Sequence, residues 1–172
     1  MGRPLQFEIN SGHPLAQGLV FAGLGRFSGT NHYHDSSLYA SYHRLYLMEP
    51  ESDWVWASEL DRYAISCDGS SEYAERDSSI LRGYPFSVVA WVKSASATVN
   101  QVIWSLGTSA SSDNHQYISL QGVLANDPVR VFSQDSSDSG GAVSTSGYTV
   151  NKWHHVCGVF GSTTSRTVYL DA

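Results

Sequence analysis

The clearest pattern in the sequence is a series of short β-branched and aromatic runs in its second half. Such runs, separated by clusters of serine, glycine, asparagine and aspartate, predict the short antiparallel strands of a sandwich or barrel. No helical period is sustained along the chain. The serine-rich stretch 136–147 is predicted to be a mobile loop. The predicted strands are YPFSVVAWVKSA (84–95), NQVIWSLGT (100–108), HQYISLQG (115–122), PVRVFSQD (128–135), KWHHVCGVF (152–160) and RTVYLDA (166–172).

The first half of the chain is less regular. Residues 15–25 predict a buried strand, and residues 31–56 predict a long aromatic connection that contains short strands. The stretch RYAISCDGSSEYAE (62–75) predicts a hairpin whose two strands meet at the Asp68-Gly69 turn. Neither a repeat nor a linker divides the sequence, so its 172 residues indicate a single domain.

Composition and charge exclude some classes of partner. The chain has 10 Lys and Arg residues against 16 Asp and Glu, for a formal net charge of −6. This argues against a nucleic-acid partner, because phosphate binding depends on clustered basic residues. Membrane insertion is not expected either, since the longest apolar run, residues 19–25, is far shorter than the roughly 20 residues that span a bilayer. The N-terminus shows no secretory signal pattern.

The chain has two cysteines, Cys67 and Cys157, in apolar contexts. Their wide separation fits no metal-binding motif. Each is predicted to be a small buried residue rather than half of a disulfide, because free cysteine is among the most buried residue types. The sequence alone does not decide whether Cys67 and Cys157 form a disulfide.

Six blocks of sequence, in this order, carry a resemblance to a known family. They are HPLAQGLVFAGLG, HDSSLYASYH, RYAISCDGSSEYAE, PFSVVAWVKS, IWSLG and NKWHHVCGVFGSTTSRTVYLD. Together they resemble a laminin-G-like or pentraxin-like domain of the concanavalin A-like lectin/glucanase superfamily. The resemblance covers residues 13–172 and leaves residues 1–12 as an N-terminal arm or extra strand. It implies an all-β jelly-roll sandwich of two antiparallel sheets. Two positions depart from the family: Cys67 replaces an aromatic residue, and Ala172 replaces a glycine.

The resemblance also implies a calcium site. In pentraxin-like relatives an Asp-Asn pair after the IWSLG-like strand binds Ca²⁺, and Asp113 and Asn114 stand at the matching point. A later acidic loop supplies further ligands in those relatives. Asp135 and Asp138 are the candidates here, unless these ligands lie beyond this chain. Oxygen ligands of this kind suit Ca²⁺, although Asp and Asn are also common turn residues.

Two histidine pairs were considered as metal sites. His154 and His155 are neighbours on a predicted strand, so they point to opposite faces and cannot both reach one metal. We expect a packed strand with one buried, hydrogen-bonded histidine. His32 and His34 share a face beside Asp35, a pattern that fits metal ligation. That stretch overlaps a family loop in which aspartate commonly serves a turn.

Candidate catalytic carboxylates are incomplete. Glu59 and Asp61 match the start of the E-x-D-x-x-E pattern of glucanases in this superfamily, but position 64 is alanine. Because glycoside hydrolysis needs two suitably spaced carboxylates, and this segment precedes a turn in the family, the sequence indicates a non-enzymatic protein. Trp54 and Trp56 alternate with Val55 and could form a sugar platform, although core packing is the commoner role of tryptophan.

The last predicted strand, residues 166–172, lacks the hairpin partner that follows it in relatives. An unpaired edge of this kind invites another strand. Three explanations stay open: a fragment of a longer chain, a reduced sandwich that lacks its C-terminal strands, or strand addition by a neighbouring subunit. The alternating LQFEI of the N-terminal arm is a candidate to fill the edge, within the chain or in a neighbour.

Two functional hypotheses follow. The first is a non-catalytic lectin-like or adhesion module that recognises a glycan or a surface ligand through edge loops, with or without calcium. The second is a structural assembly protein, such as a virion decoration, capsid-surface or fibre component, that oligomerises through its sandwich edges. Both place the protein on a virion or at a cell surface. The sequence assigns no ligand-binding residue.

Overall fold

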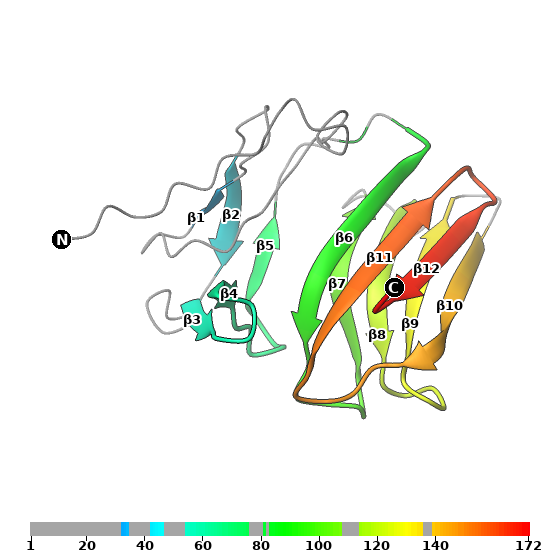
Figure 1. Cartoon of the computed structure of the whole chain (residues 1–172). Helices are drawn as coiled ribbons and strands as arrows, with labels where there is room; N and C mark the ends of the chain where they lie inside the picture. Colours follow the sequence, from blue (N-terminus) through cyan, green and yellow to red (C-terminus); the bar gives the residue numbers. More distant parts are fainter. Residues whose placement is uncertain are drawn as a thin grey trace. The chain divides into compact units, whose positions relative to one another are not determined.

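The computed structural model describes residues 54–75, 81, 83–107, 114–135 and 139–172, together with the strand backbone at 32–34 and 42–46. The chain divides into two compact units, Met1–Leu81 and Arg82–Ala172. The regular elements shown in Figure 1 are β-strands, in agreement with the sequence. The described residues include no helix of the length and apolarity that a membrane span requires. The N-terminal arm and the strand predicted at 15–25 lie outside the described residues.

The first unit contains two small antiparallel sheets. Strand β2 lies between β1 and β5, and β3 pairs with β4. The bounds of these strands are β1 (His32–His34), β2 (Tyr42–Tyr46), β3 (Trp54–Ala57), β4 (Arg62–Ile65) and β5 (Tyr73–Glu75).

The predicted Asp-Gly hairpin is wrong. The strands on either side of Asp68-Gly69 do not pair with each other, because β4 pairs with β3 and β5 pairs with β2. Asp68 instead closes a local turn, in which the backbone N–H groups of Ser70 and Ser71 donate to its Oδ1 atom at 2.7 and 3.0 Å. These bonds lower the pKa of Asp68, with the Ser70 bond contributing most. The aspartate thus satisfies the loop backbone and does not specify a two-residue turn.

The second unit is a sandwich of two antiparallel sheets (Figure 1). One sheet has the order β10-β9-β8-β7 and the other the order β12-β11-β6. This confirms the predicted fold class and all six strands predicted in this half. The bounds are β6 (Phe86–Lys93), β7 (Asn100–Gly107), β8 (His115–Gln121), β9 (Pro128–Gln134), β10 (Ser139–Gly147), β11 (Trp153–Phe160) and β12 (Arg166–Leu170).

One strand of the sandwich was missed. The predicted mobile loop 136–147 is wrong over residues 139–147, which form β10 and pair with β9. Glycine and serine have low strand propensity, so they concealed the strand. The structure uses Gly141 because an added Cβ would lie 2.7 Å from the carbonyl oxygen of Val131 and 3.2 Å from the Phe132 ring. The small residue therefore lets β10 lie close against β9.

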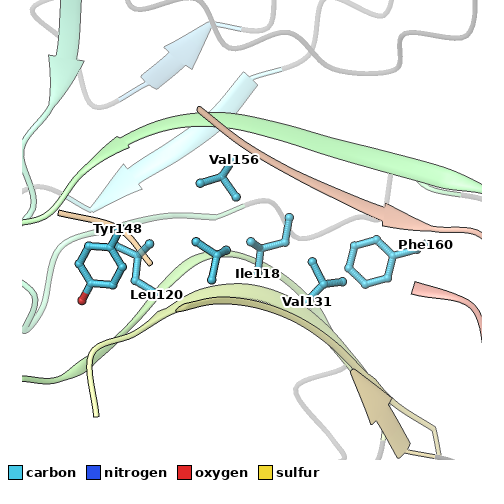
Figure 2. Close-up of a cluster of buried hydrophobic side chains, with 7 residues drawn as sticks. Ile118, Leu120, Val131, Tyr148, Val156 and Phe160 are labelled. Carbon is cyan, nitrogen blue, oxygen red and sulfur yellow. The ribbon is translucent and has the colours of Figure 1, made fainter. Parts of the chain in front are cut away.

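The core of the sandwich lies between its two sheets (Figure 2). Alternate residues of β8, β9 and β11 point inwards, as the period of a half-buried strand requires. Phe86 of β6 and Phe160 of β11 are register partners and stack with their ring centroids 4.6 Å apart. The buried apolar residues are Ile118, Leu120, Val129, Val131, Tyr148, Val156 and Phe160.

Strand β11 confirms the prediction made for the adjacent histidines. His154 is 7% exposed and lies on the core side with Val156, whereas His155 lies on the outer side next to Trp91 of β6. Cys157 is half-buried on the outer side with a free thiol, and burial raises its pKa. Cys67, which was predicted to be buried, is exposed because it lies in the loop after β4 and not on a packed strand.

Candidate functional site

The outer face of the four-stranded sheet forms a hollow. Ile118 and Val131 belong to the core, and in Figure 2 the ribbons beneath them bow towards the core. The opposite face of those strands is therefore concave. Ser119 and Gln121 of β8 point to this outer face, yet they are only 1% and 5% exposed. These two side chains are therefore covered by their neighbours and have almost no access to solvent.

The margins of the hollow are more exposed than its centre. Val102 of β7 and Val143 of β10 are the register neighbours of Ser119 and Arg130 on the same face. Both valines are more than half exposed. The concave face is thus a trough that follows β8 and β9, with β7 and β10 as its rims.

One half of the trough is aromatic. Tyr117 of β8 and Phe132 of β9 face each other across the ladder with ring centroids 5.1 Å apart. His115 stacks on Tyr117 at 5.8 Å with its ring nearly parallel to the Tyr117 ring. Cross-strand aromatic pairs of this kind stabilise the sheet. They also present ring faces on which an amphipathic ligand can stack.

The other half of the trough is polar. The guanidinium of Arg130 lies over the Phe132 ring, with its carbon 4.4 Å from the ring centroid. On the neighbouring strand the Gln121 amide donates a hydrogen bond to the Ser119 hydroxyl at 2.6 Å. Arg130 and Ser119 are register partners, so these donors and acceptors lie side by side. We refer to Tyr117, Phe132, His115, Arg130, Ser119 and Gln121 as the trough residues.

Two of the four predicted calcium ligands are described, and the register places them together. His115, the first residue of β8, pairs with Gln134, the last residue of β9. Asn114 directly precedes β8 and Asp135 directly follows β9, so both lie at the same end of the trough. Both are exposed. Asp113 and Asp138 lie outside the described residues. Among the residues that are described, no group of three or more histidine, cysteine, aspartate or glutamate side chains is arranged to hold a metal.

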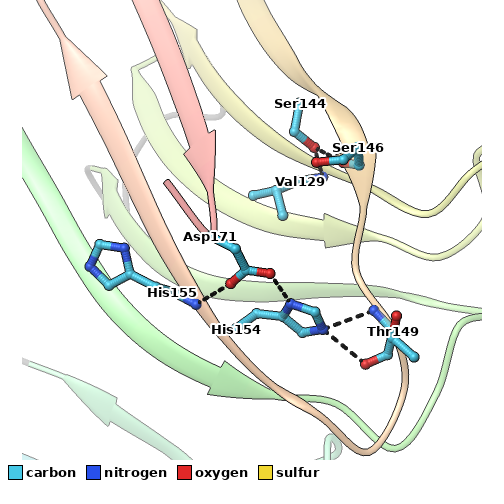
Figure 3. A network of polar contacts seen from close by, with 7 residues as sticks. All are labelled: Val129, Ser144, Ser146, Thr149, His154, His155 and Asp171. Atoms are coloured by element: carbon cyan, nitrogen blue, oxygen red, sulfur yellow. Dashed lines mark hydrogen bonds and ion pairs between the residues drawn. The ribbon is translucent and has the colours of Figure 1, made fainter.

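His154 belongs to a structural network and not to a ligand site (Figure 3). Its Nδ1 atom lies 2.7 Å from Oδ2 of Asp171, and the Thr149 N–H donates to its Nε2 atom at 2.9 Å. The His155 N–H donates to Oδ1 of Asp171 at 2.8 Å. Burial opposes the ionisation of Asp171, but the bonds from His154 and His155 outweigh it and lower the pKa of this carboxyl. The network ties β11 to the segments on either side of it.

The remaining candidates do not form a site in the described part of the chain. Glu59 and Asp61 are exposed in the turn between β3 and β4. Trp54 is buried whereas Trp56 is exposed and packs edge-on against Tyr63, so the two tryptophans do not form one open platform. The first and third residues of β1 are His32 and His34. Their side chains and Asp35 lie outside the described residues.

Comparison with known proteins supports the fold. The Laminin_G_3 family, described as part of the concanavalin A-like lectin/glucanases superfamily, matches residues 68–172, which is more than half of the chain. No curated protein sequence matches significantly. A 2.1 Å crystal structure of residues 221–444 of an S-layer domain-containing protein from Clostridium thermocellum matches with a TM-score of 0.56 and 19% identity. The alignment covers 86% of this chain and 65% of that one, and at this identity it shows a shared fold.

Proposed function

The chain belongs to the Laminin_G_3 family of the concanavalin A-like lectin/glucanases superfamily, and from this premise we propose that it is a non-catalytic module that binds a glycan in the trough. Laminin-G-like domains are typically binding modules. The observation that carries the proposal is the aromatic row of Tyr117, Phe132 and His115 with the Arg130 guanidinium beside it. Sugars have apolar ring faces and polar hydroxyl edges, and the trough offers a surface for each.

A binding role is favoured over hydrolysis by the residues on this face. Glycoside hydrolysis uses two carboxylates, one on each side of the scissile bond. The outward positions of β8 and β9 are occupied by His115, Tyr117, Ser119 and Gln121, and by Pro128, Arg130, Phe132 and Gln134. None of these residues on the two central strands is an aspartate or glutamate. The edge-loop binding site expected from the sequence remains a prediction. The trough is a second candidate binding site.

The test of this proposal is the loss of glycan binding on truncation of the aromatic row. We expect Tyr117→Ala and Phe132→Ala each to weaken binding on a glycan array by about 2- to 12-fold, because stacking of one aromatic ring contributes roughly 0.5–1.5 kcal/mol beyond the area it buries. Tyr169→Ala, on the outer face of the other sheet, is the matched control and should bind normally. Equal binding by all three variants would exclude the trough as the glycan site.

We propose calcium as an aid to this binding. Asn114 precedes His115 and Asp135 follows Gln134, so a cation bound between them would lie near the aromatic end of the trough. Asp113 and Asp138 are the sequence-predicted partners of these two residues. Ca²⁺ binds six to eight oxygen ligands, so further side chains and backbone carbonyls would need to supply the remaining ones.

A second candidate function is assembly. The outer face of the three-stranded sheet carries an apolar band, which we define as Val89, Trp91 and Tyr169. Val89 is 58% and Trp91 51% exposed. Contiguous exposed apolar surface commonly marks a protein interface. In addition, β12 hydrogen-bonds to β11 alone among the described strands, so its other edge is a candidate for strand addition.

One experiment separates these two candidates. The solution mass and the melting temperature are measured first with calcium and then with a chelator. For a calcium-assisted module we expect a monomer of 18.8 kDa. Chelation from a calcium concentration of about 100 times Kd should lower its free energy of unfolding by about 2.7 kcal/mol. A large assembly that is indifferent to the chelator would instead favour the structural role. Either role agrees with our proposal that the protein works on a virion or at a cell surface.

A further inference from the structure

We propose that the ligand of the trough is an acidic glycan, and that Arg130 binds the carboxylate or sulfate group of one of its sugars. This inference rests on the proposed function and specifies the chemical class of the ligand. The observation behind it is an arginine that is placed at the centre of the trough and lacks a partner of its own in the described part of the protein.

Arg130 occupies the middle of the concave face. Its register neighbours are Ser119 on β8 and Val143 on β10. The side chain is partly buried, and within the described residues it has neither a hydrogen bond nor an ion pair; its contact is the ring of Phe132. Arginine is seldom buried without a paired carboxylate, and its guanidinium carries five N–H donors. The absence of an acidic partner leaves these donors available for a ligand.

The local packing orients the guanidinium. Stacking over the Phe132 ring is a cation–π contact, which favours a guanidinium lying along the ring face. On the next strand, a Cβ added to Gly141 would be 3.4 Å from Arg130 Nε and 3.2 Å from the Phe132 ring. Gly141, the register partner of Phe132, therefore adds no side chain beside this contact. A planar guanidinium fork is suited to bidentate binding of a carboxylate or sulfate.

The neighbours of Arg130 fit a sugar that carries such a group. A sugar ring stacked on Phe132 or Tyr117 would place a substituent towards Arg130. The eight outward positions of β8 and β9 hold one arginine and no carboxylate, although the whole chain has a net charge of −6. The trough is thus a site of local positive charge on an acidic protein. A single arginine suits a discrete acid group, whereas polyphosphate chains are bound by clustered basic residues.

The experiment compares ligands that differ only in their acid group. The probes are oligogalacturonate with its methyl ester, and a sulfated galactan oligosaccharide, whose only acid groups are sulfates, with its desulfated form, each titrated into the whole protein by calorimetry. We expect an acidic form to bind about 10-fold or more tightly than its neutral partner, since hydrogen bonds to charged groups contribute roughly 1.5–3 kcal/mol. The pair that shows the difference tells whether the acid group is a carboxylate or a sulfate.

Two variants assign the preference to Arg130. Arg130→Gln should remove the advantage of the acidic probe over its neutral partner. Arg130→Lys, which keeps the charge but loses the fork, should retain only part of the advantage. Lys93→Gln removes a positive charge from the outer face of the other sheet and should bind both probes like the wild type. Thermal melts check that every variant is folded.

The outcomes separate this inference from the proposed function. If acidic and neutral probes bind equally and Arg130→Gln changes neither, the acidic class is wrong while glycan binding in the trough stands. If no glycan of either kind binds, and an array of neutral glycans is also negative, both proposals fail. If sodium sulfate or galacturonic acid alone binds as tightly as the oligosaccharides, the site recognises a free anion and the glycan is overturned as its ligand.

Discussion

Replacing Gly158 with alanine is expected to lower the free energy of unfolding by about 1–3 kcal/mol, the usual cost of inserting one methyl group into a well-packed core. Gly158 lies on β11 and faces the four-stranded sheet. A Cβ built on it would lie 2.5 Å from Ile118 Cδ1 and 2.9 Å from Val131 Cγ2. The two side chains therefore fill the space that a residue at this position would need. Gly158→Val adds two further carbons and should prevent folding or destabilise more strongly.

The effect of Gly158→Ala is reduced by one opposing contribution. Glycine in a strand interior is itself less favourable than alanine by roughly 0.5–1 kcal/mol. A destabilised variant therefore means that the clash outweighs this gain. Gly140→Ala is the matched control, because its Cβ would meet only Arg166 Nη1 at 3.7 Å, an ordinary contact distance. We expect Gly140→Ala to be neutral or slightly stabilising.

Urea unfolding of a double-mutant cycle tests the cause. Ile118→Val removes the Cδ1 atom that lies nearest to the new methyl group. The combined variant Gly158→Ala/Ile118→Val should then be more stable than the sum of the two single changes predicts, since residues in contact are not additive. Strict additivity would show that the methyl group is accommodated elsewhere, and the close approach of the sheets at Gly158 would not be the reason for the glycine.

The sequence predicts elements that depend on interactions between neighbouring residues. It does not predict elements that depend on contacts between residues distant in the sequence. Strands such as β6 and β11 show an alternating pattern in their own sequence. This pattern alone indicates which of their side chains face the core. Strand β10 was missed because Gly141 is explained only by contact with Val131 and Phe132 on another strand. Similarly, the Asp68 turn has a hairpin signature, but the partners of its two flanking strands are set by pairing that is distant in sequence.

The candidate site was not visible in the sequence for a similar reason. Tyr117 and Phe132 are separated by a turn, and their meeting depends on the register of β8 and β9. The alternation of apolar and other residues in HQYISLQ and PVRVFSQ signals two faces, but it does not say which face is concave or whether Arg130 has a partner. That Asn114 and Asp135 lie at the same end of the paired strands β8 and β9 depends on the same register, so it could not be derived from spacing.

The second large effect is expected at His154. We predict that His154→Ala lowers the free energy of unfolding by about 2–4 kcal/mol, because a buried donor or acceptor left without its partner costs roughly 1–3 kcal/mol. The imidazole, with its proton on Nδ1, donates to Asp171 and accepts from the Thr149 N–H. Its removal leaves the Thr149 N–H without an acceptor and opens a cavity beside Tyr148, whose ring packs edge-on against it. Loss of this side chain therefore loosens the attachment of three segments at once.

His155→Ala is the matched control for this change. His155 is the next residue, but it takes part in the network through its backbone N–H and carbonyl, which bond to Asp171 and survive the substitution. Its side chain contacts Trp91 on the outer face. We expect a loss of less than about 1 kcal/mol, the usual range for partly exposed positions. Equal losses for the two histidines, measured by urea unfolding at neutral pH, would contradict the structural role assigned to His154.

Acid sensitivity provides an independent measurement of the same network. The pKa of Asp171 is lower in the folded protein than its ordinary value, so ionised Asp171 stabilises the fold. This contribution is fully present above the unfolded pKa of about 3.9, and it is lost as the pH falls through the lower folded pKa. In Asp171→Asn one of the two acceptor oxygens becomes an NH2 group, which cannot accept the hydrogen bond from His154 or from the His155 N–H. The variant should be less stable than the wild type at neutral pH, and the difference should shrink below about pH 4 because the wild type alone loses this carboxylate. A difference that stays constant from pH 7 to pH 3 would show that the charge of Asp171 has no part in holding β11 to its neighbours.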